Sequence, residues 1–399
     1  MADTKRLALL EQALADGNGI LRLEPAWVAR DFLPTLFRIG LSEKEARVGT
    51  RGHICERWLA STTKADNAVG PKDEGLSYVA LDHGARMTLR EAVQIGGPML
   101  LGAAYARKHG NRLGRLPKIY DFAARIPHHY HQMAKDAAKV GHNAKEEAYY
   151  FPTDVDMGPH PETFFGVHRW IVEDKAQAKV ILPYLVDWNS DLILKHAWAE
   201  LLVAGEGFHV PAGILHAPGT AVTIELQEDS DVFGMCQALV AGKIIPKSLL
   251  FKDVSPKDRK RYGERIILDQ IDWELSSDPY FWENRHLEPL LCDKQPGGSE
   301  YWIYYNTLKF SGKRLVVKPG KTFTTKERGV YSLLVWRGKG TYDGIPVKGD
   351  SPGDDELLVT HAKAVTPVKV RNTGTRDLEI IKFFGPDINF DVPMKKVRK

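Results

Sequence analysis

The chain has 399 residues, of which 43% are hydrophobic and 27% charged, so it can bury a sizeable core and is not expected to be disordered. This length predicts two or three domains. The formal net charge is +4, and Lys and Arg are spread along the chain, whereas nucleic-acid binding requires a concentrated basic face, so we expect no nucleic-acid partner.

The N-terminal segment predicts an amphipathic helix. Residues 7–14 carry apolar side chains at helical spacing, and charges throughout this stretch leave no apolar core of a signal peptide. No run of about 20 apolar residues predicts a membrane span. The cysteines Cys55, Cys236 and Cys292 are too few and too scattered for a disulfide framework. We therefore expect a cytoplasmic protein with reduced thiols and no membrane partner.

The pattern of the chain changes three times. Residues 1–120 mix helix and strand signals, including a helix that begins after a cap at Thr88 and ends near a glycine. Residues 121–245 alternate short apolar runs with Gly, Pro and Asp turns, which is typical of a sandwich or barrel. Residues 246–300 are rich in charged and aromatic residues and predict a helical connector. Strand signals return over residues 301–399 with similar punctuation and predict a second barrel of the same type.

Two histidines in the segment "IPHHYHQM" suggest a metal site. His129 and His131 stand two residues apart, and side chains two apart in a strand point to the same face. Two imidazoles on one face give the convergent geometry that a metal ion needs. The alternative is a surface histidine cluster, because His128 lies in the same segment.

The segment "GEGFHVPAGILHAPG" contains a more specific pattern. Gly205 is followed by five residues and then by Pro211, Gly213 and His216 at the spacing Pro-x-Gly-x-x-His. This spacing resembles the second signature motif of the cupins, in which a tight turn ends one strand and the histidine points inward from the next. Thr220 stands where the cupin pattern often has an asparagine, and this difference affects the exit of the strand rather than the metal ligand.

The acidic ligand is not set by spacing alone. Cupins commonly place a glutamate a few residues after the histidine pair, but the residues directly after His131 include none. The next candidates along the chain are Glu146 and Glu147 in "HNAKEEAYYFP".

Several segments in order resemble the type I mannose-6-phosphate isomerases, over roughly residues 50–235. They are "ICERWLAST", "TLREAV" with "LLG", "RIPHHYHQM", "AKEEAYY", "FHVPAGILHAPG" and "TIELQEDSD". The resemblance implies a mainly β fold of two cupin (jelly-roll) barrels with added helical segments. Residues 1–120 would complete a first, metal-binding barrel at 121–245, and 301–399 would form a degenerate second barrel. It also implies that the metal ligands are His129, His131, Glu147 and His216.

Two departures from the family affect the expected chemistry. His129 stands where the family has a glutamine, and a set of three histidines and one glutamate suits a divalent metal, with zinc expected and manganese or iron as alternatives. The family also has an arginine shortly after Ser230-Asp231, but residues 232–235 here contain no basic residue. Because arginine binds phosphate through paired hydrogen bonds, a free sugar or another polyol acid is as compatible with this chain as a sugar phosphate.

The resemblance implies a metal-dependent aldose–ketose isomerase that moves a proton between neighbouring carbons of a small-molecule sugar through an enediol. Glu225 is the expected base, although it could equally orient a ligand histidine by a hydrogen bond. Lys145 is the second expected catalytic residue, as an acid or as the partner of developing negative charge. A sugar pocket would be lined by Arg125, Tyr149, His168, Arg169 and Trp170.

Two other functions remain open on the sequence. An iron-dependent cupin dioxygenase could use the same ligand set, and a non-catalytic sugar-binding cupin is compatible with the missing arginine. We expect no metal in the C-terminal barrel, because the chain has Thr324-Thr325-Lys326-Glu327 where a second histidine pair would be. Away from the metal ligands, we expect His128 and His142 to be solvated and His286 to lie at the surface.

Overall fold

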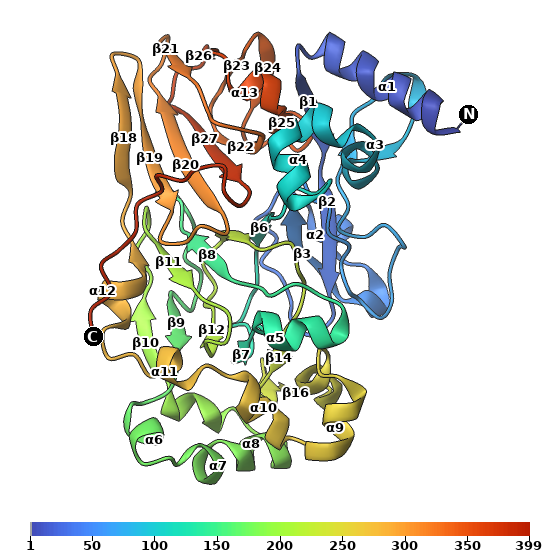
Figure 1. Ribbon diagram of the computed structural model, residues 1–399. Helices are drawn as coiled ribbons and strands as arrows, with labels where there is room; N and C mark the ends of the chain where they lie inside the picture. Colours follow the sequence, from blue (N-terminus) through green and yellow to red (C-terminus); the bar gives the residue numbers. More distant parts are fainter. Residues whose placement is uncertain (1) are drawn as a thin grey trace. The chain divides into compact units, whose positions relative to one another are not determined.

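The structure, a computed structural model, describes residues 2–399, and the chain divides into two compact units (Figure 1). Each unit is assembled from separated stretches of the sequence. Unit 1 extends to Val28 and includes Arg57–Ile119 and Leu287–Met394, and unit 2 consists of Ala29–Glu56, Tyr120–His286 and Lys395–Lys399. Strands in several antiparallel sheets predominate over helices, which confirms the predicted mainly β class.

Unit 1 contains two antiparallel sheets. The longer sheet has the order β18 (Leu290–Gln295), β19 (Gly298–Tyr304), β20 (Ser311–Val317), β27 (Leu378–Phe384), β22 (Tyr331–Arg337), β25 (Glu356–Val359), β1 (Ile20–Glu24), β4 (Tyr78–Val79) and β5 (Met87–Thr88). The shorter sheet has the order β21 (Thr322–Thr325), β26 (Val368–Asn372), β23 (Lys339–Tyr342) and β24 (Ile345–Lys348). N-terminal strands thus extend a sheet that is otherwise built from residues beyond 289.

Helices α1 (Ala2–Asp16), α3 (Leu89–Leu101), α4 (Ala103–His109) and α13 (His361–Ala364), with the 3-10 turn η2 (Asp82–Gly84), complete unit 1. The helix predicted after Thr88 is confirmed as α3. The Thr88 side chain accepts a hydrogen bond from the backbone of Glu91, whose carboxylate accepts from the Thr88 backbone in return. The helix stops at Gly102, whose φ of 84° suits glycine. Leu89, Val93 and Leu100 pack into the apolar core of the unit.

A charged cluster lies inside unit 1 at the position where we expected no metal. The Lys382 ammonium is completely buried and donates to Glu300 at 2.6 Å, to Thr325 at 2.6 Å and to Glu327 at 2.8 Å. Lys313 also contacts Glu327, at 2.7 Å. Thr325 and Glu327 belong to the segment 324–327 that the sequence analysis compared with a histidine pair, and their oxygens here hold a lysine ammonium.

Unit 2 contains a five-stranded antiparallel sheet and a second group of three antiparallel strands. The five-stranded order is β10 (Trp198–Leu201), β9 (Glu162–Phe165), β12 (His216–Ala217), β7 (His129–Tyr130) and β14 (Gly234–Met235). The other group is β11 (Gly207–Val210), β8 (Glu147–Tyr150) and β13 (Thr223–Gln227), and β15 (Leu239–Val240) pairs with β16 (Lys243–Ile244). Apolar side chains of these strands form two buried clusters.

Short helices follow and connect the strands of unit 2. They are α2 (Glu43–Ala46), α5 (Ala134–Ala137), α6 (Trp170–Glu173), α7 (Gln177–Val180), α8 (Leu182–Asp187), α9 (Pro256–Tyr262), α10 (Arg265–Gln270), α11 (Trp273–Ser276) and α12 (Phe281–Arg285), with the 3-10 turns η1 (Gly49–Arg51), η3 (Ala138–Val140), η4 (Leu192–His196) and η5 (Lys247–Phe251). Helices α9 to α12 fall in the segment predicted to be helical, whereas the end of that segment forms strand β18.

Strands β2 (Ala26–Arg30), β3 (His53–Trp58), β6 (Leu116–Tyr120) and β17 (His286–Leu287) lie where the chain passes from one unit to the other. The compact units are therefore interleaved along the sequence. The predicted division into 1–120, 121–245, 246–300 and 301–399 describes consecutive sequence segments rather than compact units. It stays a prediction.

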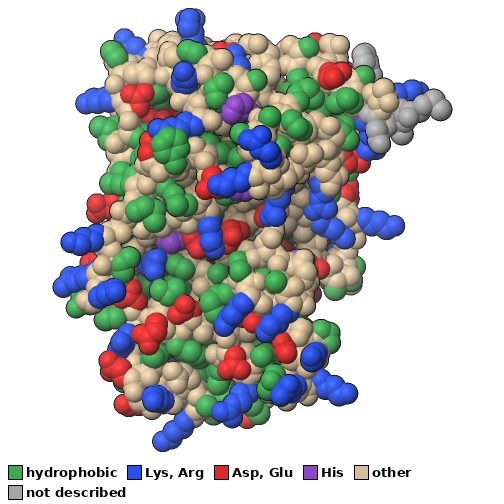
Figure 2. Space-filling model, viewed as in Figure 1, with side chains coloured by type: hydrophobic (Ala, Val, Ile, Leu, Met, Phe, Trp, Pro, Cys, Tyr) green, Lys and Arg blue, Asp and Glu red, His purple; other side chains and the backbone are tan. Residues whose placement is uncertain are grey.

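Surface charge and helix hydropathy bear on the expected partners. On the face shown in Figure 2, acidic and basic side chains are interspersed. Among residues 2–399, no helix is both long enough and apolar enough to cross a bilayer.

Candidate metal centre

Neighbouring strands of unit 2 bring the three predicted histidines together. His129 lies in β7, and His216 opens β12 directly opposite it in the antiparallel register. His131 follows β7, and its carbonyl accepts a hydrogen bond of 2.9 Å from the backbone N–H of Gly213. Gly213 has a φ of +90°, which favours glycine and forms the tight turn predicted from the motif. The turn therefore joins His216 to the strand that carries the other two histidines.

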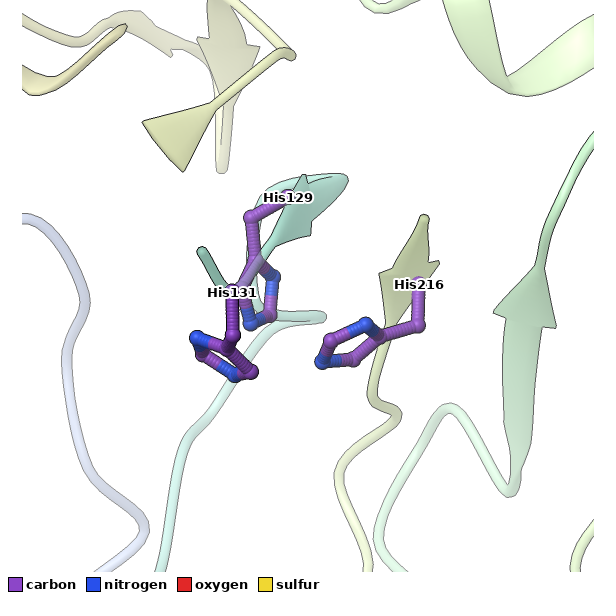
Figure 3. Close-up of side chains that lie close together, drawn as sticks. All are labelled: His129, His131 and His216. Atoms are coloured by element: carbon purple, nitrogen blue, oxygen red, sulfur yellow. The ribbon is translucent and has the colours of Figure 1, made fainter. Parts of the chain in front are cut away.

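The three imidazole rings face one another (Figure 3). One ring nitrogen from each of His129, His131 and His216 lies within 4.8 Å of the others. The ring centroids are 4.1 Å apart for His129 and His216 and 4.9 Å apart for His129 and His131. All three side chains are buried, as ligands of an ion inside a β structure must be.

Backbone carbonyls fix the tautomer of each ring. The Nδ1 atoms of His129, His131 and His216 lie 2.7, 2.7 and 2.9 Å from the carbonyl oxygens of Pro127, Val232 and Ile214, respectively. A carbonyl oxygen can only accept, so each Nδ1 carries the proton and each Nε2 presents a lone pair to the centre. Outer hydrogen bonds of this kind hold histidine ligands in metal sites.

Burial also favours the neutral, metal-binding form of these histidines. Burial, with further lowering by His216 and His131, holds the pKa of His129 well below its usual range. Burial and the nearby Lys145 lower the pKa of His131 to about 3. Both rings are therefore uncharged at neutral pH, which is the state that ligates a metal.

Glu147 completes the set from a different strand. Its Oε2 lies 2.9 Å from Nε2 of His131, and its Oε1 lies 3.0 Å from Nε2 of His216. Burial opposes ionisation of this carboxyl, but the nearby Lys145 ammonium outweighs it and holds the pKa of Glu147 well below its usual range. The structure thus brings together all four predicted metal ligands.

The chemistry of these four groups fits a divalent cation. The imidazole Nε2 atoms and an ionised carboxylate are all acceptors, and acceptors at about 3 Å repel one another unless a cation or donor lies between them. Within residues 2–399, Nε2 of His216 is buried without a hydrogen-bond partner, and Oε2 of Glu147 has only an ion pair with the Lys145 ammonium, 2.9 Å away. Leaving such atoms unsatisfied is costly, and a metal bound by three nitrogens and one oxygen would satisfy them.

The two predicted catalytic residues lie beside this cluster. The Lys145 ammonium is 2.9 Å from both Nε2 of His131 and Oε2 of Glu147, and it is 3.7 Å from Oε1 of Glu225. Glu225 lies in β13, opposite Tyr149 of β8, and is almost completely buried. A lysine and a second carboxylate therefore border the metal ligands on one side.

The predicted pocket residues have different surroundings. The Tyr149 hydroxyl donates to Oε1 of Glu147, so this residue contacts the fourth predicted metal ligand. Arg125 is partly buried and forms an ion pair with Glu162. Arg169 is exposed and forms an ion pair with Glu173. His168 and Trp170 are also exposed. Substrate contacts of these residues stay a prediction.

Two expectations about other histidines are wrong. His128 is buried rather than solvated, because it precedes a strand whose next side chain on the same face, Tyr130, belongs to an apolar core. His286 is also buried rather than at the surface. It is hydrogen-bonded to Glu206 at 2.6 Å and stacks on Trp282, with the ring centroids 4.0 Å apart. His142 is exposed, as expected.

Sequence reasoning missed the three carbonyls that orient the histidines and the hydroxyl that contacts Glu147. Backbone acceptors leave no mark in the sequence. The position of Tyr149, two residues after Glu147 in a strand, places both side chains on one face and was a usable signal.

No protein-family model and no curated protein matches this chain. Solved structures do match. A mannose 6-phosphate isomerase from Bacillus subtilis is similar with a TM-score of 0.61 and 16% identity, over 92% of this chain and 99% of the other. A zinc-bound mannose 6-phosphate isomerase and a variant of the phosphomannose isomerase from Salmonella typhimurium each give a TM-score of 0.63 at 11% identity, over 92% of this chain and 100% of theirs. The chain therefore has the fold of these isomerases, which confirms the resemblance at the level of the fold.

Proposed function

We propose that this chain is a divalent-metal-dependent aldose–ketose isomerase that acts on a sugar or a sugar phosphate. The observation that carries the proposal is the convergence of His129, His131, His216 and Glu147 next to Lys145 and Glu225. The zinc-bound solved structure of the same fold supports zinc as the metal. In isomerases of this kind the bound metal acts as a Lewis acid that polarises the substrate's oxygens.

Proton transfer is the part of the reaction assigned to the protein. A base must remove the proton from the carbon beside the carbonyl and return it to the carbonyl carbon, while the hydroxyl proton passes from the oxygen on the first carbon to the former carbonyl oxygen. Glu225 is the base in this proposal, because its buried carboxylate faces the same space as the metal ligands. Lys145, 3.7 Å from Glu225, stabilises negative charge on the substrate oxygen.

The segment that replaces the family's arginine bears on the substrate. Val232 and Met235 are buried, and the Val232 carbonyl accepts from Nδ1 of His131. This segment therefore orients a metal ligand and offers no cation to a phosphate. We propose free aldoses as substrates alongside phosphorylated ones, and the assay must include both.

The same proposal covers the fold and the location of the protein. We infer a metal-binding cupin barrel at residues 121–245 and a second cupin barrel at 301–399. The thiols of Cys55, Cys236 and Cys292 are free, which supports a reducing, cytoplasmic location.

The test is incubation of the zinc- or manganese-loaded protein with a panel of aldoses, free and phosphorylated, in D₂O. The proposal expects conversion of at least one member to its ketose, with exchange of the carbon-bound proton detected by NMR. Binding of a sugar without conversion would instead establish a non-catalytic sugar-binding protein, and oxygen uptake by the iron-loaded protein would establish a dioxygenase. Either result would overturn the isomerase assignment.

A further inference from the structure

Tyr149 lies next to the carboxylate ligand in the same strand. It follows Glu147 by two residues in β8, so both side chains are on one face of the strand. Phe208 in β11 and Glu225 in β13 are its direct neighbours across the sheet. Tyr149 therefore faces the interior, where the metal ligands converge.

The ring of Tyr149 is held by its surroundings. It is 1% exposed, and the ring of Tyr120 meets it edge-on at 90°, with the centroids 6.3 Å apart. Phe151, on the same face of β8, lies 6.5 Å from it between ring centroids. A ring packed in this way has little rotational freedom, so the place of its hydroxyl is set by the fold.

That hydroxyl donates a hydrogen bond to Oε1 of Glu147. The other carboxylate oxygen, Oε2, is the one near His131, at 2.9 Å from Nε2. A phenol bound to one oxygen stops the carboxylate from rotating and occupies one of the lone pairs of Oε1. Oε2 is then held between Nε2 of His131 and the Lys145 ammonium, each 2.9 Å away.

We propose that Tyr149 is a positioning residue, which orients Glu147 so that it binds the divalent metal through a single carboxylate oxygen. Removal of such an outer hydrogen bond typically weakens metal binding by about 10–100-fold. The hydroxyl would also set the coordination number, because a carboxylate released from it can use both oxygens. The inference rests on the metal centre of the proposed function, but it does not depend on isomerase activity.

The test is Tyr149→Phe, which removes only the hydroxyl. The affinities for Zn²⁺ and Co²⁺ are measured by competition with a chelator, and the visible spectrum of the Co²⁺ form reports the coordination number. The expected result is about 10–100-fold weaker binding and a less intense Co²⁺ spectrum, as four ligand atoms become five. Binding within twofold of the unsubstituted protein, with the same spectrum, would overturn the proposal.

Tyr130→Phe is the matched control. Tyr130 is equally buried, and its hydroxyl donates to Oε1 of Gln270 at 2.6 Å, away from Glu147. The control should lose stability but keep the metal affinity and the Co²⁺ spectrum. An equal loss of affinity in both variants would mean that Tyr149 acts through general packing, and it would also overturn the proposal.

A second measurement covers the case in which Tyr149→Phe does not fold. X-ray absorption of the unsubstituted, zinc-loaded protein should show three nitrogens and one oxygen at about 2.0–2.2 Å. Two carboxylate oxygens at that distance would contradict ligation through a single oxygen. If the unsubstituted protein binds no metal at all, the metal centre itself fails, which is distinct from a failure of Tyr149.

Discussion

Nε2 of His216 lies 3.0 Å from Oε1 of Glu147, and both atoms are acceptors. In a neutral imidazole the single proton lies on Nδ1, where the Ile214 carbonyl accepts it, so Nε2 faces the carboxylate as an acceptor. Both side chains are buried, so water cannot screen the contact. This pair, which comes from strands far apart in the sequence, is the most direct structural sign of a cation site.

Removal of the last histidine should remove the metal. His216→Ala takes away one of four ligand atoms and should lower bound zinc below one equivalent per chain, as determined by elemental analysis after dialysis. His142→Ala is the control, because His142 is exposed and is not one of the four proposed ligands. This variant should retain one equivalent of zinc. Equal metal content in the two variants would exclude His216 as a ligand.

Substitution of the proposed base should separate catalysis from metal binding. Glu225→Gln keeps the shape of the side chain but cannot accept a proton, so exchange of the substrate's carbon-bound proton in D₂O should slow by about 10²–10⁴-fold. The metal content should stay at one equivalent, since Glu225 is not a ligand in this account. If proton exchange persists, or if the metal is lost instead, Glu225 has a structural role.

The buried ammonium of unit 1 should be essential for stability. Lys382→Met leaves Glu300 and Glu327 buried with Lys313 as their remaining cation, and breaking a buried pair costs about 3–5 kcal/mol. Lys318→Met is the control, because Lys318 pairs with Asp377 in solvent, where ion pairs contribute less than about 1 kcal/mol. Denaturant unfolding measures both losses. Comparable losses in the two variants would show that the cluster is not a stabilising network.

Glu356 should make stability depend on pH. Burial raises its pKa from 4.5 to about 7, although Arg57 acts in the opposite direction. The folded state therefore binds more protons than the unfolded state between pH 4.5 and 7, so its stability falls as the pH rises through this window. Glu356→Gln cannot ionise and should lack this loss, which is about 3 kcal/mol at most.

The measurement is the free energy of unfolding at pH 4.5 and at pH 7 for both proteins. The stability of the unsubstituted chain relative to Glu356→Gln should decrease between the two values. A difference that is the same at both pH values would mean that Glu356 ionises normally in the fold.

The sequence was most informative where spacing is tied to geometry. His129 and His131 were predicted to share a face because strand side chains alternate, and His216 was predicted from the turn spacing that Gly213 requires. Glu147 could be chosen over Glu146 only through the resemblance to a family. The two residues are adjacent, and nothing in the spacing decides which of them faces the histidines.

Features that depend on distant packing could not be predicted. His128 directly precedes β7, which lies between β12 and β14 in its sheet and has both of its residues buried, so strand alternation leaves no solvated side at this place. His286 is buried because Trp282 and Glu206 cover it, and the sequence gives no sign that they meet. N-terminal strand β1 pairs with β25, more than 300 residues away, which local patterns cannot reveal.

The central claim is most directly tested by anomalous diffraction from crystals of the zinc-loaded protein, recorded on both sides of the zinc absorption edge. The account predicts one strong peak per chain, about 2.0–2.2 Å from Nε2 of His129, His131 and His216 and from one carboxylate oxygen of Glu147. A peak bound to other residues, or no peak in unit 2 after loading, would contradict the account.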